Sequence, residues 1–210
     1  MGKQSHGLHK RRVNTIEPRQ RFLIVCEGTE TEPNYFKSFK VPTHPIIEIT
    51  IHGTGKNTID VIKAAIKKRN DQTKNASKAK YDQVWCVFDR DDFPTQQFGD
   101  ALDLAKKEGI RVAYSNEAFE LWYLLHFDYH QSGIHRKDYI TLLDKRLEIP
   151  YKKNSDKIYD YLEDKQATAI NNAERLLNTY CPPNPATDNP STTVHQLVKE
   201  LNRFIKHPKE

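Results

Sequence analysis

Four short apolar runs, each followed by a segment with helical periodicity, occupy the chain up to Phe127. The runs read FLIVC, IIEITI, VWCVFD and IRVAYS, and they begin at Phe22, Ile46, Val84 and Ile110. Strands that alternate with helices in this way are typical of a parallel sheet with helical crossovers. Beyond Phe127 only helical patterns remain. We therefore expect an α/β protein in which a mainly parallel sheet of about four strands is flanked by helices and followed by a C-terminal helical region.

The expected helices follow the strands and then fill the C-terminal part of the chain. Ile59, Ile62, Ala65 and Ile66 recur at helical spacing, which predicts the helix after the second strand. The lysine-rich segment NDQTKNASKAK is expected to be a loop, and the proline-rich segment CPPNPATDNP separates the last two helices. We expect helices over residues 32–40, 59–69, 94–108, 116–127, 139–147, 156–163, 167–177 and 193–205.

Length and composition indicate a globular protein. The 210 residues suit one sizeable domain, alone or with a smaller appendage, and 37% of them are hydrophobic and 29% charged. We expect a basic, flexible arm at residues 1–20, an α/β core at 21–127 and a helical region at 128–210 that packs on the core. No apolar run approaches the roughly 18 residues of a membrane span, and the N-terminus lacks a signal-peptide pattern. The expected location is the cytoplasm, with no membrane partner.

Several common functional motifs are absent. Cys26, Cys86 and Cys181 are far apart and lack CxxC spacing, so the sequence indicates neither a zinc site nor a disulfide framework. The segment GTGKNT resembles a phosphate-binding loop, but Thr50 and Asn57 stand where that motif needs Gly and Ser or Thr. Neither HExxH nor a Gly-x-Ser-x-Gly elbow occurs.

Acidic side chains follow three of the four expected strands. The carboxyl ends of parallel strands meet at one edge of a sheet, and ligands bind at that edge. The acids and one serine at these strand ends are Glu27, Glu30 and Glu32; Asp89, Asp91 and Asp92; and Ser115, Glu117 and Glu120. Clustered carboxylates repel one another and need a counter-charge. Their hard oxygen ligands suit Mg²⁺ or Mn²⁺. Turns and helix N-termini also favour single acids, so the metal interpretation depends on all three groups sharing one edge.

Four sequence motifs carry a resemblance to known proteins. A strand that ends in Glu-Gly, followed by a later strand that ends in Asp-x-Asp, resembles the Toprim fold of topoisomerases, primases and OLD-type nucleases. VCEGTETEPNYF, VFDRDDF, SNEAFELWYLLHF and NPSTTVHQLV together are similar to the RloB-like family, which is associated with restriction and phage-defence loci. The resemblance covers the chain from about Arg21 onward.

The resemblance implies roles for the strand-end acids. Glu27 takes the position of the Toprim glutamate, which serves metal binding or general acid/base chemistry, and Asp89 with Asp91 matches the metal-binding Asp-x-Asp pair. Glu32 follows at a spacing about one residue longer than in OLD-type nucleases, which leaves open whether it or Glu30 reaches the ion.

The fourth strand offers two further interpretations. Ser115 and Glu117 resemble a Ser-x-Glu pair of OLD-type nucleases, whereas FELW makes Glu120 the closer RloB-like match. The resemblance therefore implies Glu27 and Glu120 as catalytic residues and Glu27, Glu32, Asp89 and Asp91 as metal ligands. Glu30, Asp92, Ser115 and Glu117 are additional candidates.

The implied activity is metal-dependent hydrolysis of phosphodiester bonds in DNA or RNA, in a defence setting, with Mg²⁺ or Mn²⁺ as cofactor. Basic residues would contact the nucleic-acid phosphates. They are Arg11, Arg12, Lys56, Lys152 and Lys153. An alternative is a regulatory or binding subunit without catalysis, which docks on a partner such as a defence-locus ATPase. A haloacid-dehalogenase-type phosphatase fits less well, because that family places its aspartate pair after the first strand and follows it with Thr or Val.

Overall fold

The computed structural model describes residues 20–39, 46–51, 58–75, 79–91 and 94–204. Within these ranges four strands form one parallel sheet in the order β2-β1-β3-β4. The strands are β1 (Arg21–Cys26), β2 (Ile46–Ile51), β3 (Gln83–Arg90) and β4 (Arg111–Asn116). The expected α/β fold with a mainly parallel sheet is confirmed.

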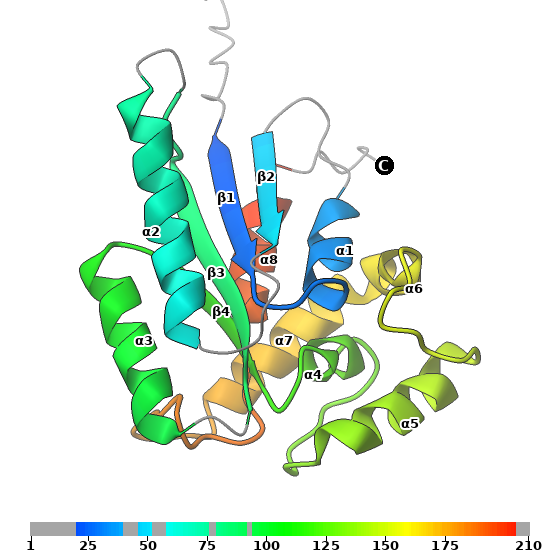
Figure 1. The fold of residues 1–210 in the computed structure, drawn as a ribbon. Coiled ribbons are helices and arrows are strands. Elements are labelled where there is room, and N and C mark those ends of the chain that lie inside the picture. Colours follow the sequence, from blue (N-terminus) through cyan, green and yellow to red (C-terminus); the bar gives the residue numbers. More distant parts are fainter. Residues whose placement is uncertain (1–19, 40–45, 52–57, 76–78, 92–93, 205–210) are drawn as a thin grey trace, which may run out of the picture.

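The strand order reverses its direction next to β1. The chain places β2 on one side of β1 and then returns to place β3 on the other side (Figure 1). Cys26 at the end of β1 lies beside Val87 of β3. The residues that follow β1 and those that close β3 therefore share one edge of the sheet. In open α/β sheets, ligands bind at the carboxyl edge where the strand order reverses.

Two helices cover one face of the sheet. They are α2 (Thr58–Lys74) and α3 (Thr95–Lys107). Side chains that alternate along β1 and β3, among them Leu23, Val25 and Phe88, form a buried cluster with these helices. Alternation along a strand sends the remaining side chains to the opposite face.

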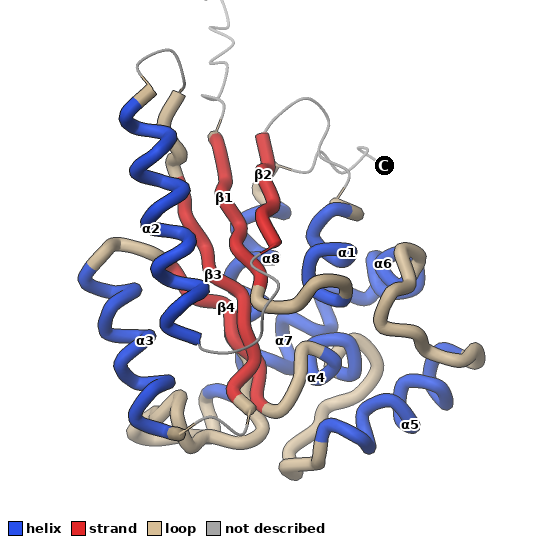
Figure 2. Tube along the Cα trace, in the orientation of Figure 1, coloured by secondary structure: helices blue, strands red, loops and turns tan. Residues whose placement is uncertain are grey.

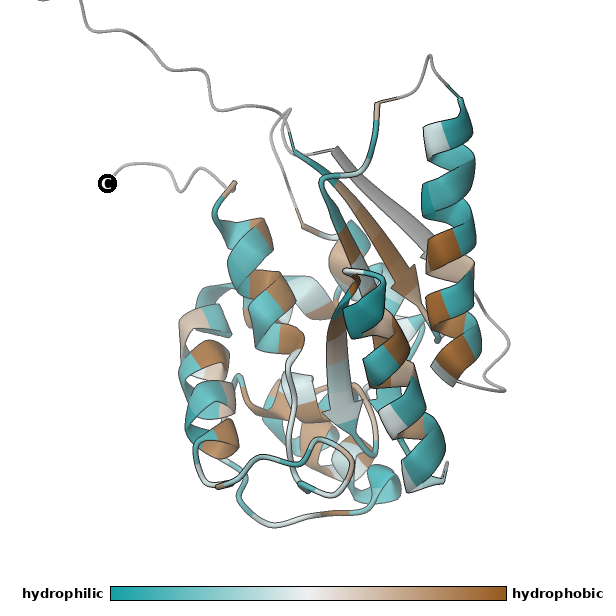
Figure 3. Ribbon diagram, turned by 90° about the vertical axis from the view of Figure 1, so that its left-hand side faces the viewer, coloured by the Kyte–Doolittle hydropathy of each residue, from teal (hydrophilic) through white to brown (hydrophobic). Residues whose placement is uncertain are grey.

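Helices α1 and α4 and the helices of the C-terminal region lie on the opposite face (Figure 2). Phe22, Ile24 and Val87 of the sheet belong to one buried cluster that includes residues of all these helices. Several helices have one hydrophobic side and one hydrophilic side (Figure 3). The elements are α1 (Thr31–Lys37), α4 (Glu120–Leu124), α5 (Arg136–Leu147), α6 (Ile158–Leu162), the 3₁₀ turn η1 (Glu163–Lys165), α7 (Gln166–Leu177) and α8 (Val194–Asn202).

Several expected helix boundaries differ from those in the structure, and the largest differences are at the end of α2 and the start of α4. The segment 70–80 was expected to be a loop, but α2 continues through Lys74, because the buried side chain of Gln72 donates to the carbonyl of Ala79 and ties the helix end down. The helix expected over 116–127 is reduced to α4, because Glu117 adopts a left-handed conformation with φ 59° that interrupts a right-handed helix.

A short segment near the C-terminus pairs with the exposed edge of β4. Thr192 forms an antiparallel bridge with Ser115, and the amide of Thr193 donates to the carbonyl of Tyr114 at 2.8 Å. No strand was expected beyond the fourth, so this pairing was missed. Among the helices of the described ranges, none has the length and apolar character needed to cross a bilayer.

Candidate functional site

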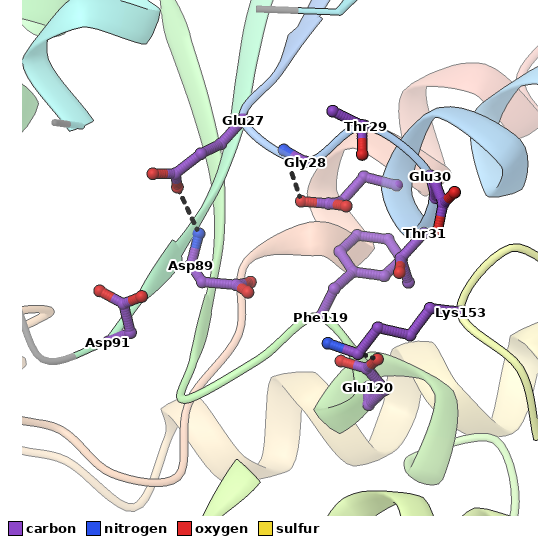
Figure 4. A pocket seen from close by; sticks show the side chains of 11 residues that line it. Glu27, Gly28, Thr29, Glu30, Thr31, Asp89, Asp91, Phe119, Glu120 and Lys153 are labelled. Atoms are coloured by element: carbon purple, nitrogen blue, oxygen red, sulfur yellow. Dashed lines mark hydrogen bonds and ion pairs between the residues drawn. The ribbon is translucent and has the colours of Figure 1, made fainter. Parts of the chain in front are cut away.

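A pocket opens at the carboxyl edge of the sheet, where β1 and β3 end (Figure 4). Its volume is about 270 Å³, which is enough for a phosphate group or a hydrated cation. The lining comes from the β1–α1 turn, the end of β3, the start of α4 and the loop after α5. The lining residues are Glu27, Gly28, Thr29, Glu30, Thr31, Glu32, Asp89, Asp91, Phe119, Glu120 and Lys153.

Glu27 and Asp89 are linked across the two strand ends. The amide of Glu27 donates to the carbonyl of Val87 at 2.9 Å, which extends the β1–β3 pairing by one residue. In return the amide of Asp89 donates to Oε2 of Glu27 at 3.3 Å. The side-chain atom Oδ1 of Asp89 is buried and has no hydrogen-bond partner among the described residues. Strand pairing thus fixes the backbone positions of both acids.

Glu32 folds back from the first turn of α1 onto Gly28. The amide of Gly28 donates to Oε1 of Glu32 at 3.3 Å, and the Glu32 side chain is only 5% exposed. A Cβ atom at position 28 would lie 2.7 Å from Oε1 of Glu32 and closer still to Oε2. Only glycine leaves room for this carboxylate beside the backbone.

Asp91 is held from outside the sheet. Nη2 of Arg136, the first residue of α5, lies 3.1 Å from Oδ2 of Asp91 and also donates to the carbonyl of Glu117 at 2.6 Å. The amide of Glu117 donates to the carbonyl of Arg90 at 2.9 Å. Both backbone groups of this left-handed residue are therefore satisfied, which offsets its unfavourable conformation. Oδ1 of Asp91 is buried and lacks a partner in the described part of the chain.

Glu120 lies at the start of α4 and is 2% exposed. Its Oε1 accepts a hydrogen bond from the hydroxyl of Tyr151 at 2.9 Å. Nζ of Lys153 lies 3.6 Å from the same oxygen, and the lysine side chain is 58% exposed. Tyr151 and Lys153 belong to the loop between α5 and α6, so this loop forms one wall of the pocket.

The crowding of acids perturbs their ionisation. Burial raises the pKa of Glu27 to about 7, and the charges of Asp91 and Glu32 add to the increase. Burial, followed by the neighbouring charge of Glu120, raises the pKa of Glu32. Burial and then Glu32, Glu120 and Glu27 raise the pKa of Asp89 well above its usual range. A positive charge in the pocket would stabilise the ionised forms of all three acids.

The donor set fits a hard divalent cation. Every acidic side chain in the pocket offers carboxylate oxygens, which are ligands that Mg²⁺ and Mn²⁺ accept. Oδ1 of Asp89 and Oδ1 of Asp91 are buried atoms that lack a partner within the described ranges. No three His, Cys, Asp or Glu residues in those ranges are already arranged to hold an ion. Side-chain rotation would therefore have to accompany metal binding.

A family model for RloB-like proteins matches residues 22–201. The chain belongs to the RloB-like family. The match extends from β1 into α8, so it covers every segment that lines the pocket. Comparison with curated proteins finds no match, and comparison with solved structures finds none.

The pocket of this RloB-like protein contains most of the acids that the sequence singled out. Glu30 lines the pocket and is exposed, whereas Ser115 is buried and forms a 2.8 Å hydrogen bond with Thr192 outside the pocket. Glu117 contributes its carbonyl group to Arg136 and is absent from the lining. Lys152 is exposed next to Lys153. Asp92, Arg11, Arg12 and Lys56 lie outside the described residues.

Sequence reasoning missed Arg136 and Tyr151. Arg136 resembles the other basic residues of α5 in sequence, and nothing in its neighbourhood indicates a contact with Asp91. Tyr151 directly precedes the pair Lys152-Lys153, whose positive charge predicts a phosphate contact. That pair was the one signal pointing to the loop after α5 in this RloB-like chain.

Proposed function

We propose that this RloB-like protein is a Toprim-type, Mg²⁺-dependent nuclease that hydrolyses phosphodiester bonds of DNA or RNA in phage defence. The observation that carries the proposal is the meeting of acids from three separate segments in one pocket. Glu27 follows β1, Asp89 lies near the end of β3 with Asp91 directly after that strand, and Glu120 begins α4. The pocket lies at the reversal of strand order, where α/β sheets bind ligands.

Glu27, Asp89 and Asp91 would hold the cation, with Glu32 or Glu120 assisting. When bound, the cation would supply an activated water molecule and stabilise the leaving oxygen of the phosphodiester. Burial raises the pKa of Glu27 to about 7, so this side chain is readily protonated near neutral pH before a cation binds. Binding of the cation therefore releases this proton and strengthens as the pH rises.

Lys153 is suited to contact the substrate. Its ammonium group is largely exposed and lines the pocket, and its distance of 3.6 Å from Glu120 leaves it only loosely paired. A phosphate group in the pocket would bind the Lys153 ammonium group more strongly than the carboxylate of Glu120 does, because Tyr151 also binds that carboxylate. We assign Lys153 to the phosphate beside the cleaved phosphodiester bond. The exposed Lys152 would contact a phosphate further along the nucleic-acid backbone.

The test is cleavage of DNA and RNA by the purified full-length protein in Mg²⁺ or Mn²⁺. Glu27→Gln and Asp89→Asn preserve side-chain size but remove a negative charge, and each should reduce cleavage more than about 100-fold. The reason is that even outer partners of metal ligands contribute about 10- to 100-fold. Asp103→Asn on the exposed side of α3 is the matched control and should cleave like the wild type.

Two results would contradict the nuclease assignment. Cleavage that survives both substitutions would mean that the activity has another site. A folded wild-type protein that cleaves neither DNA nor RNA in either metal would favour the alternative of a non-catalytic subunit.

A further inference from the structure

Four acids of the pocket share one arrangement, in which a protein donor holds one carboxylate oxygen. Backbone amides hold two of them: Asp89 donates to Oε2 of Glu27, and Gly28 donates to Oε1 of Glu32, both at 3.3 Å. Side chains hold the other two, at Oδ2 of Asp91 and Oε1 of Glu120. Each of these four carboxylates is thus restrained through one oxygen.

The two side-chain donors come from opposite ends of one helical element. Arg136 is the first residue of α5, and Tyr151 follows shortly after the last residue, Leu147. Figure 4 shows the acids that they hold, Asp91 and Glu120, on opposite sides of the pocket. The element formed by residues 136–151 therefore spans the pocket and reaches both sides of it.

Arg136 binds the carbonyl of Glu117 in addition to Asp91. Its Nη2 contacts Asp91 and the carbonyl of Glu117 together, so the guanidinium joins the end of β3 to the turn before α4. That carbonyl belongs to a left-handed residue, whose conformation the contact helps to maintain. The geometry depends on the length and planarity of the guanidinium, which lysine does not reproduce.

Tyr151 is anchored in a comparable way. Its amide donates to Oδ1 of Asp144 in α5 at 2.6 Å, and its ring packs edge-on against Tyr123 of α4. The Tyr151 side chain is 8% exposed, so its hydroxyl meets Glu120 away from solvent. A hydrogen bond to a buried carboxylate restricts its orientation more strongly than one in water.

We propose that Arg136 and Tyr151 are positioning residues, which orient Asp91 and Glu120 so that the remaining oxygen of each can bind a cation. This inference rests on the proposed function and adds to it a role for the helical region. Donors that orient a metal ligand are worth about 10- to 100-fold in metal affinity or activity. Neither residue touches the substrate in this assignment.

Charge-conserving and shape-conserving variants test the inference. Arg136→Lys keeps the positive charge but shortens the side chain, and Tyr151→Phe removes only the hydroxyl group. Two matched controls lie in α5. Arg146→Lys alters an arginine that pairs with Asp128 at 2.5 Å, and Tyr139→Phe removes a buried hydroxyl that has no partner among the described residues.

Two measurements on the full-length protein follow. Calorimetry measures Mn²⁺ affinity without nucleic acid, and steady-state kinetics separate kcat from KM for cleavage. Arg136→Lys and Tyr151→Phe should each lower the Mn²⁺ affinity and kcat about 10- to 100-fold, with KM and its salt dependence unchanged. Both controls should match the wild type, and thermal unfolding should show all four variants folded.

Other outcomes overturn the inference in distinguishable ways. If Arg136→Lys and Tyr151→Phe match their controls in both measurements, the two residues do not position the acids. A loss confined to KM, with a weaker salt dependence, would make Arg136 a phosphate contact. If the wild type binds Mn²⁺ but cleaves nothing, the proposed function fails, while calorimetry of the variants still decides their positioning role. Absence of Mn²⁺ binding in the wild type overturns both.

Discussion

Gly28 is the residue at which the backbone and an acidic side chain of the pocket come closest. Its amide donates to Glu32, and a methyl group at this position would overlap the carboxylate. Among the described glycines, only Gly109 has a φ angle in the left-handed region, and Gly28 does not. Close approach, and not backbone conformation, is therefore what requires glycine here.

Gly28→Ala should displace the Glu32 carboxylate and lower the proposed nuclease activity at least about 10-fold, the effect expected when a ligand loses its orienting donor. The free energy of unfolding should change by less than about 1 kcal/mol, because alanine tolerates the backbone conformation and the methyl group can push the carboxylate toward the open pocket. Cleavage assays and urea unfolding measure the two effects.

Gly99→Ala is the control for this substitution. Gly99 lies inside α3, and a Cβ atom there meets nothing within 4 Å. Alanine should therefore stabilise the helix by about 0.5–1 kcal/mol and leave cleavage unchanged. If Gly28→Ala cleaves as well as Gly99→Ala does, the position of Glu32 is irrelevant to the reaction.

At the scale of elements, the segment around Thr192 completes the edge of the sheet. Oγ1 of Thr192 donates to the carbonyl of Tyr114 at 2.9 Å, pairs with Oγ of Ser115 at 2.8 Å and accepts from the amide of Val194 at 3.2 Å. Thr192 is completely buried. A covered edge also prevents β4 from pairing with other chains.

Thr192→Val preserves the shape of the side chain but removes all three hydrogen bonds. We expect a loss of about 2–4 kcal/mol in the free energy of unfolding, because the substitution leaves buried polar groups without partners. Urea unfolding measures the change. Thr187→Val, at an exposed threonine in the preceding loop, should change stability by less than about 0.5 kcal/mol. Equal stability of the two variants would mean that the segment does not secure the edge.

The sequence predicts which helices and strands form better than it predicts the residues at which they begin and end. Apolar runs of strand length lie on all four strands. In β1, β3 and β4 their side chains are buried on both faces of the sheet, as is usual in parallel sheets. The helix expected over 116–127 fails at Glu117, whose left-handed conformation depends on the distant partners Arg90 and Arg136. Local periodicity does not contain such contacts, so it predicts a helix where tertiary structure imposes a turn.

The residues of the candidate site also fall into two groups, those that the sequence could predict and those that it could not. Glu27, Asp89 and Asp91 could be predicted to meet, since parallel strands place their carboxyl ends at one edge. Arg136 and Tyr151 could not be predicted, because their contacts depend on how the helical region folds back over the sheet edge. The family resemblance identified the acids because they lie in its motifs. Arg136 and Tyr151 lie outside those motifs, so the resemblance did not indicate them.

At the scale of the whole molecule, the helical region and the sheet share one buried cluster. Phe22 of β1, Trp122 of α4 and Leu143 of α5 belong to it, as do residues of α6, α7 and α8. Packing of the cluster therefore sets the position of α5 relative to the strand ends. This explains how donors far along the chain can hold acids at the sheet edge with defined distances.

The acids at the carboxyl edge are proposed to form one cation site. The most direct measurement is an anomalous-scattering map from a crystal of the full-length protein soaked in Mn²⁺. We expect a peak within coordination distance of Glu27, Asp89 and Asp91, and loss of that peak in Asp89→Asn. A map with no peak in this pocket, or with Mn²⁺ bound only elsewhere, would contradict the proposed cation site.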